Sequence, residues 1–163
     1  MRDTGYPKHP DEVALLPGVC EALAQLRRLG YELVLISNQA GVPRGYMTRA
    51  DVAAVHVRLE QCLAEGGARL SAFYYCYDAP DSASEFRKPA PGMLLKARDE
   101  LGIALKDSFM IGDKDIDVEA GRRAGCRAIL YRECQKAPTT SAFADHVAAS
   151  WPEIVDIVSG KKS

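Results

Sequence analysis

Residues 108–131 read Ser-Phe-Met-Ile-Gly-Asp-Lys-Asp-Ile-Asp-Val-Glu-Ala-Gly-Arg-Arg-Ala-Gly-Cys-Arg-Ala-Ile-Leu-Tyr, and this stretch decides the fold. The apolar run at 109–111 predicts a buried strand that ends at Gly112, and the run at 128–130 predicts a second strand. A helix between them is expected to reach Ala124 and to end at Gly125. The stretch therefore predicts a strand–turn–helix–strand unit with acidic residues at the edge where open α/β sheets bind ligands.

Three carboxylates, Asp113, Asp115 and Asp117, follow the first of these strands. Asp115 and Asp117 have a purely structural explanation, because acidic side chains cap a helix start and complement its dipole. Asp113 differs, since it follows the strand directly and precedes Lys114. Mg²⁺ takes hard oxygen ligands, usually one or two carboxylates together with phosphate and water. The cluster therefore indicates a phosphate-and-metal site.

Alternating helices and strands extend over the rest of the chain. Helices are expected at 17–29, 48–65, 91–101 and 150–158, and strands at 31–36, 70–77 and 146–149. This order predicts one domain at 1–163 of the α/β class, a doubly wound, Rossmann-like parallel sheet with helices on both faces. The polar loop at 78–88 is too short for a large cap domain.

The composition limits which classes of binding partner and which cellular compartment are expected. The net charge of −1 comes without a basic block, and no apolar run is long enough to cross a membrane, so neither nucleic acid nor a membrane is expected. The five cysteines are odd in number and none forms a C-x-x-C pair, which is typical of a reduced, cytoplasmic protein. A monomer that binds a small phosphorylated metabolite is expected.

Polar groups follow three of the predicted strands: Ser37-Asn38, Arg87-Lys88 beyond a loop, and Asp113-Lys114. A hydroxyl, an amide, cations and a carboxylate at one sheet edge would suit a phosphoryl group, whose transfer needs positioning and charge compensation. Each pair also has a plain alternative, as turn formers or as surface charges.

The same residues carry a family resemblance. Their order resembles the second, third and fourth motifs of the haloacid-dehalogenase-like phosphatases, in particular the heptose bisphosphate phosphatases and the related histidinol phosphatases. The matching phrases are Ser37-Asn38-Gln39, Arg87-Lys88-Pro89, and Gly112-Asp113-Lys114 with Asp117. Residues 3–6 resemble the substrate loop of the heptose branch, and the resemblance extends to about residue 135.

The resemblance implies a role for each matching residue. Three are implied in catalysis: Ser37 would bind the transferring phosphoryl group, Lys88 would neutralise its charge, and Asp113 would bind Mg²⁺. Asp117 would be a second metal ligand or would orient Lys88. The implied substrate-binding set is Asp3, Gly5, Tyr6, Ser37, Asn38, Gln39, Arg87, Lys88 and Lys114.

Two departures from the family pattern affect the function. The family opens with a central strand ending in Asp-x-Asp-Gly-Thr, whose first aspartate attacks phosphorus and whose second is the acid and base, and the 163 residues contain no such motif. Losing that strand would forfeit about 5–12 kcal/mol of apolar burial, so an N-terminally truncated chain or an internal start is expected. Many heptose-branch members also bind zinc through three cysteines and a histidine, whereas this loop holds only Cys76, so no zinc is expected.

The expected function is magnesium-dependent hydrolysis of a phosphomonoester on a small metabolite, through an aspartyl-phosphate intermediate. A sugar bisphosphate is the favoured substrate, and histidinol phosphate is the alternative substrate. The chain as written is expected to be inactive, because it lacks the nucleophile. A non-catalytic phosphosugar-binding or regulatory protein is the alternative. A phospho-receiver domain is disfavoured, because receivers place their acids before the Lys-Pro pair and here Lys88 precedes Asp113.

Overall fold

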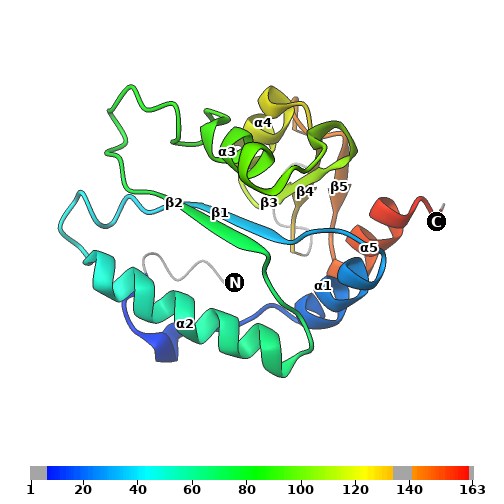
Figure 1. The fold of residues 1–163 in the computed structure, drawn as a ribbon, viewed down its shortest axis with the longest axis horizontal. Helices are drawn as coiled ribbons and strands as arrows, with labels where there is room; N and C mark the ends of the chain where they lie inside the picture. Colours follow the sequence, from blue (N-terminus) through cyan, green and yellow to red (C-terminus); the bar gives the residue numbers. More distant parts are fainter. Residues whose placement is uncertain (1–6, 134–140, 162–163) are drawn as a thin grey trace. The chain divides into compact units, whose positions relative to one another are not determined.

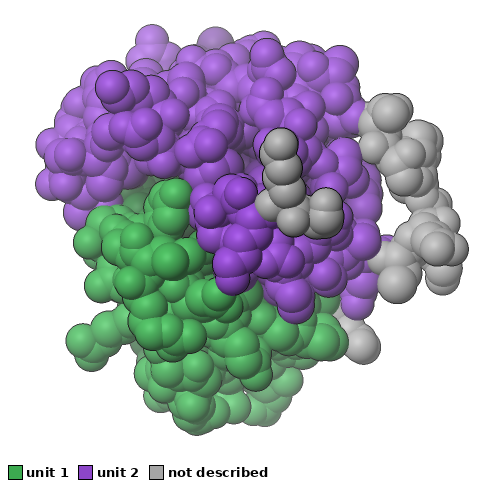
Figure 2. Space-filling model, turned by 90° about the vertical axis from the view of Figure 1, so that its right-hand side faces the viewer, with its two compact units in different colours: residues 1–82 green, residues 83–163 purple. Residues whose placement is uncertain are grey.

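The computed structural model describes residues 7–133 and 141–161, and the chain divides into two compact units, residues 1–82 and 83–163 (Figure 2). The first unit contains η1 (Pro10–Glu12), α1 (Val19–Arg28), β1 (Val34–Asn38), α2 (Arg49–Glu65) and β2 (Ala72–Cys76). The second contains α3 (Gly92–Leu101), η2 (Leu105–Asp107), β3 (Phe109–Gly112), α4 (Asp115–Ala124), β4 (Arg127–Tyr131), β5 (His146–Ala148) and α5 (Trp151–Ser159).

The first unit is built on a two-stranded parallel sheet. β1 pairs with β2 in a register that joins Val34 to Ala72 and Asn38 to Cys76. Helix α2 runs along this sheet (Figure 1), and the ring of its buried His56 lies 3.9 Å from the ring of Phe73 in β2. The carboxyl ends of β1 and β2 therefore lie side by side and lead into the loops that follow them.

Helix α2 begins with a capping box. The Thr48 hydroxyl accepts a hydrogen bond from the Asp51 N–H at 3.1 Å, and the Asp51 carboxylate accepts one from the Thr48 N–H at 2.7 Å. Two N–H groups that lack a partner within the helix are satisfied in this way, which stabilises the helix start.

Strand β1 begins later than the sequence predicts. The apolar pattern predicts a strand at 31–36, but the strand covers Val34–Asn38. The Tyr31 N–H instead donates to the Leu26 carbonyl and caps the end of α1, and the Leu33 N–H donates to the Ser71 hydroxyl. Ser37 and Asn38 consequently lie within the last residues of the strand rather than in a turn.

The second unit holds a three-stranded parallel sheet in the order β3-β4-β5 (Figure 1). Helix α4 packs against β3 and β4. The core of the second unit includes side chains that are fully shielded from solvent, namely Val118, Ala128, Ile129, Leu130, Ala148 and Ile154. The near-continuous apolar run in β4 is what a parallel strand buried on both faces requires.

The predicted α/β class with parallel strands is confirmed, and the strand–turn–helix–strand unit at 108–131 forms as expected. The single domain at 1–163 and the missing central strand stay predictions. Within the part of the chain that the structure describes, no helix is long and apolar enough to span a bilayer.

Cys126, just before β4, makes stability depend on pH. The residue is 7% exposed, and burial raises the pKa of its thiol from 9.0 to about 11. A raised folded-state pKa means that the neutral thiol contributes stability below pH 9, and that this contribution is lost as the pH rises toward 11. We therefore expect the free energy of unfolding to fall over this range by more in the parent chain than in Cys126→Ala. Urea titrations at half-unit pH intervals measure this, and equal slopes in both chains would contradict it.

Candidate functional site

The site of the second unit starts at the carboxyl end of β3. The strand ends at Gly112, the exposed Asp113 and Lys114 form the turn, and α4 begins at Asp115. A Cβ atom on Gly112 would lie 2.2 Å from the Asp117 Cβ, so only glycine lets the strand end approach the first turn of α4 this closely. The sequence therefore brings the Asp117 carboxylate against the strand end that carries Asp113.

Lys88 and Asp117 form a buried ion pair. The Lys88 Nζ lies 2.6 Å from the Asp117 Oδ1, and the two side chains are only 10% and 8% exposed. The other carboxylate oxygen accepts the Lys114 N–H at 3.1 Å, so Asp117 also caps α4. Each charge compensates the other, because an unpaired charge at this depth would be strongly destabilising.

The loop that carries Lys88 is held by its own hydrogen bonds. The Ser84 hydroxyl accepts the N–H groups of Phe86 and Arg87 at 3.1 and 3.2 Å, and the Gly92 N–H donates to the Glu85 carbonyl at 2.9 Å. A Cβ at Gly92 would lie 2.3 Å from that carbonyl oxygen, so the loop closes tightly before α3. Lys88 therefore lies in a loop whose backbone is hydrogen-bonded both before it, at Phe86 and Arg87, and after it, at Gly92.

The residues of this unit suit a hard divalent cation. Asp113 offers an exposed carboxylate at the strand end, whereas the Asp117 carboxylate is occupied by Lys88 and by the Lys114 N–H. Among the described residues no three His, Cys, Asp or Glu side chains gather at one point. Mg²⁺ usually takes one or two protein carboxylates together with phosphate and water, so Asp113 could serve as one of its ligands.

Ser37, Asn38 and Gln39 lie at the carboxyl end of β1, in the first unit. The Gln39 N–H donates to the Cys76 carbonyl at 2.7 Å, and its side-chain amide donates to the Ser37 hydroxyl at 3.2 Å. The ladder with β2 thus extends past Asn38 and fixes the backbone that carries this hydroxyl and amide.

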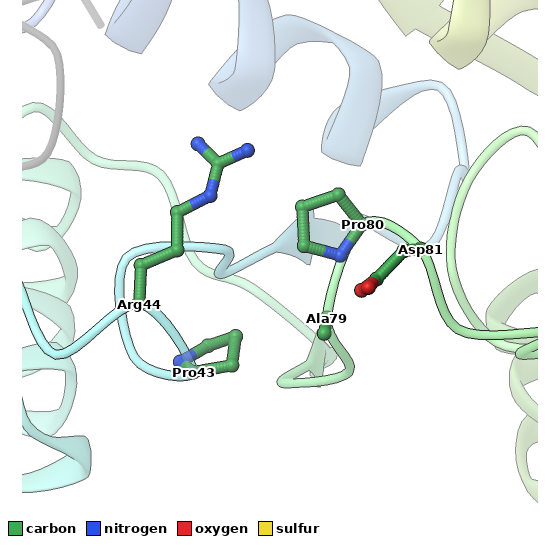
Figure 3. Close-up of a pocket in the computed structure, with 5 residues that line it drawn as sticks. All are labelled: Pro43, Arg44, Ala79, Pro80 and Asp81. Atoms are coloured by element: carbon green, nitrogen blue, oxygen red, sulfur yellow. The ribbon is translucent and has the colours of Figure 1, made fainter.

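A shallow pocket opens beside these strand ends within the first unit. Its volume is about 410 Å³, and it lies between Pro43 and Arg44 of the loop after β1 and Ala79, Pro80 and Asp81 of the loop after β2 (Figure 3). The sequence predicts a loop at both places but assigns none of these five lining residues a site role. Cys76, at the end of β2, is the one cysteine of the segment where many relatives of the heptose branch bind zinc. It is buried, and its thiol donates to the Asp78 carboxylate at 3.5 Å. The absence of zinc stays a prediction.

The structure brings together Lys88, Asp117 and the Asp113–Lys114 turn, and the roles of these residues stay predictions. Arg87 is half-buried beside Lys88. Asp3, Gly5 and Tyr6 lie outside the described residues. The sequence did not indicate Arg132, whose guanidinium donates to the Asp113 carbonyl, because no local pattern links the end of β4 to the turn after β3.

Comparison with known proteins identifies the family. The HAD-hydrolase-like family model matches residues 85–154. The D-glycero-beta-D-manno-heptose-1,7-bisphosphate 7-phosphatase of Pasteurella multocida (strain Pm70) is 35% identical over 169 residues, which cover 99% of this chain and 92% of the relative. The phosphatase of the same name from Pseudomonas putida is 33% identical over 157 residues, covering 92% of this chain and 90% of the relative.

Solved structures agree with the sequence relatives. The D,D-heptose 1,7-bisphosphate phosphatase from B. bronchiseptica, complexed with magnesium and phosphate, matches with a TM-score of 0.86 at 26% identity and covers 99% of this chain and 93% of its own. The enzyme of that name from Burkholderia thailandensis matches with a TM-score of 0.69 at 25% identity, covering 99% and 96%. The chain therefore belongs to the haloacid-dehalogenase-like phosphatases, in the group that contains these heptose bisphosphate phosphatases.

Proposed function

We propose that this chain binds a small phosphorylated sugar of the heptose bisphosphate class together with Mg²⁺, and that the reaction of this site is hydrolysis of a phosphomonoester. The proposal depends on the buried Lys88–Asp117 pair and the exposed Asp113. Lys88 is a cation held in place, and the Asp113 carboxylate is a hard oxygen ligand for a metal. The names of the relatives support the substrate class, and the magnesium and phosphate in the B. bronchiseptica structure support the ligand pair.

Lys88 supplies the fixed positive charge. Its ammonium is held 2.6 Å from Asp117, so it needs little reorganisation to meet a phosphoryl oxygen. Asp117 is then the residue that orients Lys88, and direct metal ligation by Asp117 is the weaker of its two predicted roles because Lys88 occupies that carboxylate. Asp113 would hold Mg²⁺, which supplies charge compensation to the phosphoryl oxygens.

In the first unit, the resemblance implies Ser37 and Asn38 as hydrogen-bond donors to a phosphoryl group. The Gln39 side-chain amide donates to the Ser37 hydroxyl at 3.2 Å. Arg87 and Lys114 are proposed to bind the rest of an anionic substrate, since both are cations flanking the Lys88–Asp117 pair in sequence. Asp3, Gly5 and Tyr6 stay predictions as substrate-loop residues.

Turnover needs a group that the 163 residues do not contain. The family's nucleophile belongs to an Asp-x-Asp-Gly-Thr motif, which is absent from the sequence, so no aspartyl-phosphate is expected to form on this chain. We therefore propose that this chain binds its ligand with little or no phosphate release.

Isothermal titration tests the proposed binding. We expect the parent chain to bind heptose bisphosphate in the presence of Mg²⁺, and Lys88→Met to weaken this affinity by about 10- to 100-fold, because a hydrogen bond to a charged group contributes about 1.5–3 kcal/mol. Lys106→Met is the matched control, since Lys106 is an exposed lysine of the same unit. Equal affinities in the two variants would contradict the proposal, and a parallel titration with histidinol phosphate compares the two substrate classes.

A further inference from the structure

Arg132 follows the carboxyl end of β4 and reaches back to the turn that carries Asp113. Its Nη1 donates a hydrogen bond to the Asp113 backbone carbonyl. Its own N–H donates to the Ala148 carbonyl at 2.9 Å, which anchors its backbone beside β5. Its Nε is buried and has no hydrogen-bond partner.

The sheet register explains why the two residues meet. β3 and β4 are parallel neighbours, and Gly112 is paired with Leu130, so Asp113 and Arg132 both leave the sheet at the same edge. The planar, always charged guanidinium is a rigid donor, which suits it to holding one carbonyl in a defined place. The contact therefore joins the end of one strand to the turn after its neighbour.

We propose that Arg132 is a positioning residue, which holds the Asp113 carbonyl so that the turn presents the Asp113 carboxylate to a divalent cation. The inference rests on the proposed function, in which Asp113 binds Mg²⁺. Groups that hold metal ligands in place affect metal affinity nearly as strongly as the ligands do.

Electrostatics and positioning predict opposite results for Arg132. A cationic guanidinium near a metal site repels Mg²⁺, so its removal should tighten binding if charge alone mattered. If Arg132 holds the turn, its removal frees the Asp113 backbone and should weaken binding. The sign of the change therefore separates the two effects.

Mn²⁺ binding to the metal-free chain, followed by electron paramagnetic resonance, tests the inference without turnover. We expect Arg132→Ala to weaken Mn²⁺ binding by about 10- to 100-fold. Arg132→Lys, which keeps the charge and one donor, should lose less. Arg127→Ala is the matched control, because Arg127 is the exposed arginine at the other end of β4, with its guanidinium 3.9 Å from the Phe109 ring. It should leave the affinity unchanged.

The outcomes separate this inference from the proposed function. If the parent binds Mn²⁺, Asp113→Asn loses it, and Arg132→Ala binds as tightly as the parent or more tightly, the positioning role is overturned and the metal site stands. If the parent itself binds no Mn²⁺, the proposed metal site is wrong and the inference falls with it. Urea unfolding shows whether Arg132→Ala folds. If it does not, Arg132→Lys decides the question. A Mn²⁺ affinity of Arg132→Lys equal to that of the parent and of Arg127→Ala overturns the inference, and a weaker affinity supports it.

Discussion

Replacing Asp117 with asparagine is expected to lower the free energy of unfolding by about 3–5 kcal/mol, because the change leaves the Lys88 ammonium buried without its counter-charge. The two groups are 2.6 Å apart and about nine-tenths shielded from solvent. Asparagine retains the shape of the side chain and an oxygen that accepts the Lys114 N–H, so the helix cap should survive. Urea unfolding followed by circular dichroism measures the loss.

The reciprocal change and the double variant complete the cycle. Lys88→Met should cost a similar amount, since it leaves the Asp117 carboxylate unpaired. The double variant, Lys88→Met with Asp117→Asn, buries neither charge and should cost much less than the sum of the two single changes. Simple additivity of the three values would show that the ion pair is not the source of the stability.

The second large effect concerns catalysis. Joining the first strand of a heptose bisphosphate phosphatase, with its Asp-x-Asp-Gly-Thr motif, ahead of Met1 is expected to raise phosphate release by at least about 10³-fold, because it supplies the nucleophile. Phosphate release from heptose bisphosphate with Mg²⁺ is the measurement.

Two variants of that longer chain control the result. Replacing the first aspartate of the added motif with asparagine should abolish the gain, and so should Asp113→Asn if Asp113 binds the metal. A longer chain that folds and binds ligand but gains no activity would favour the alternative, in which binding itself is the function.

The sequence predicts most of the local structure near the site. The unit at 108–131 forms as expected because its signals are local: two apolar runs, a glycine that ends the helix, and acidic residues at the helix start. The capping box at Thr48 and Asp51 forms for the same reason. The start of β1 was predicted three residues early, because the Tyr31 N–H caps the end of α1 instead of joining the sheet.

Contacts between distant segments could not be predicted from spacing. The link between Lys88 and Asp117 was implied by family resemblance, and the structure adds that the pair is buried and that Gly112 makes room for it. The hydrogen bond from Arg132 to the Asp113 carbonyl depends on the β3–β4 register, which no local pattern encodes. The pocket between the loops after β1 and β2 depends on tertiary structure in the same way.

Phosphate release by the 163-residue chain itself, with heptose bisphosphate and Mg²⁺, tests the central claim most directly. We expect heat of binding in the calorimeter and no phosphate release above the enzyme-free rate, because the site retains Lys88, Asp117 and Asp113 but the sequence contains no Asp-x-Asp-Gly-Thr nucleophile. Magnesium-dependent release that Asp113→Asn abolishes would contradict it, since the chain would then carry a nucleophile of its own.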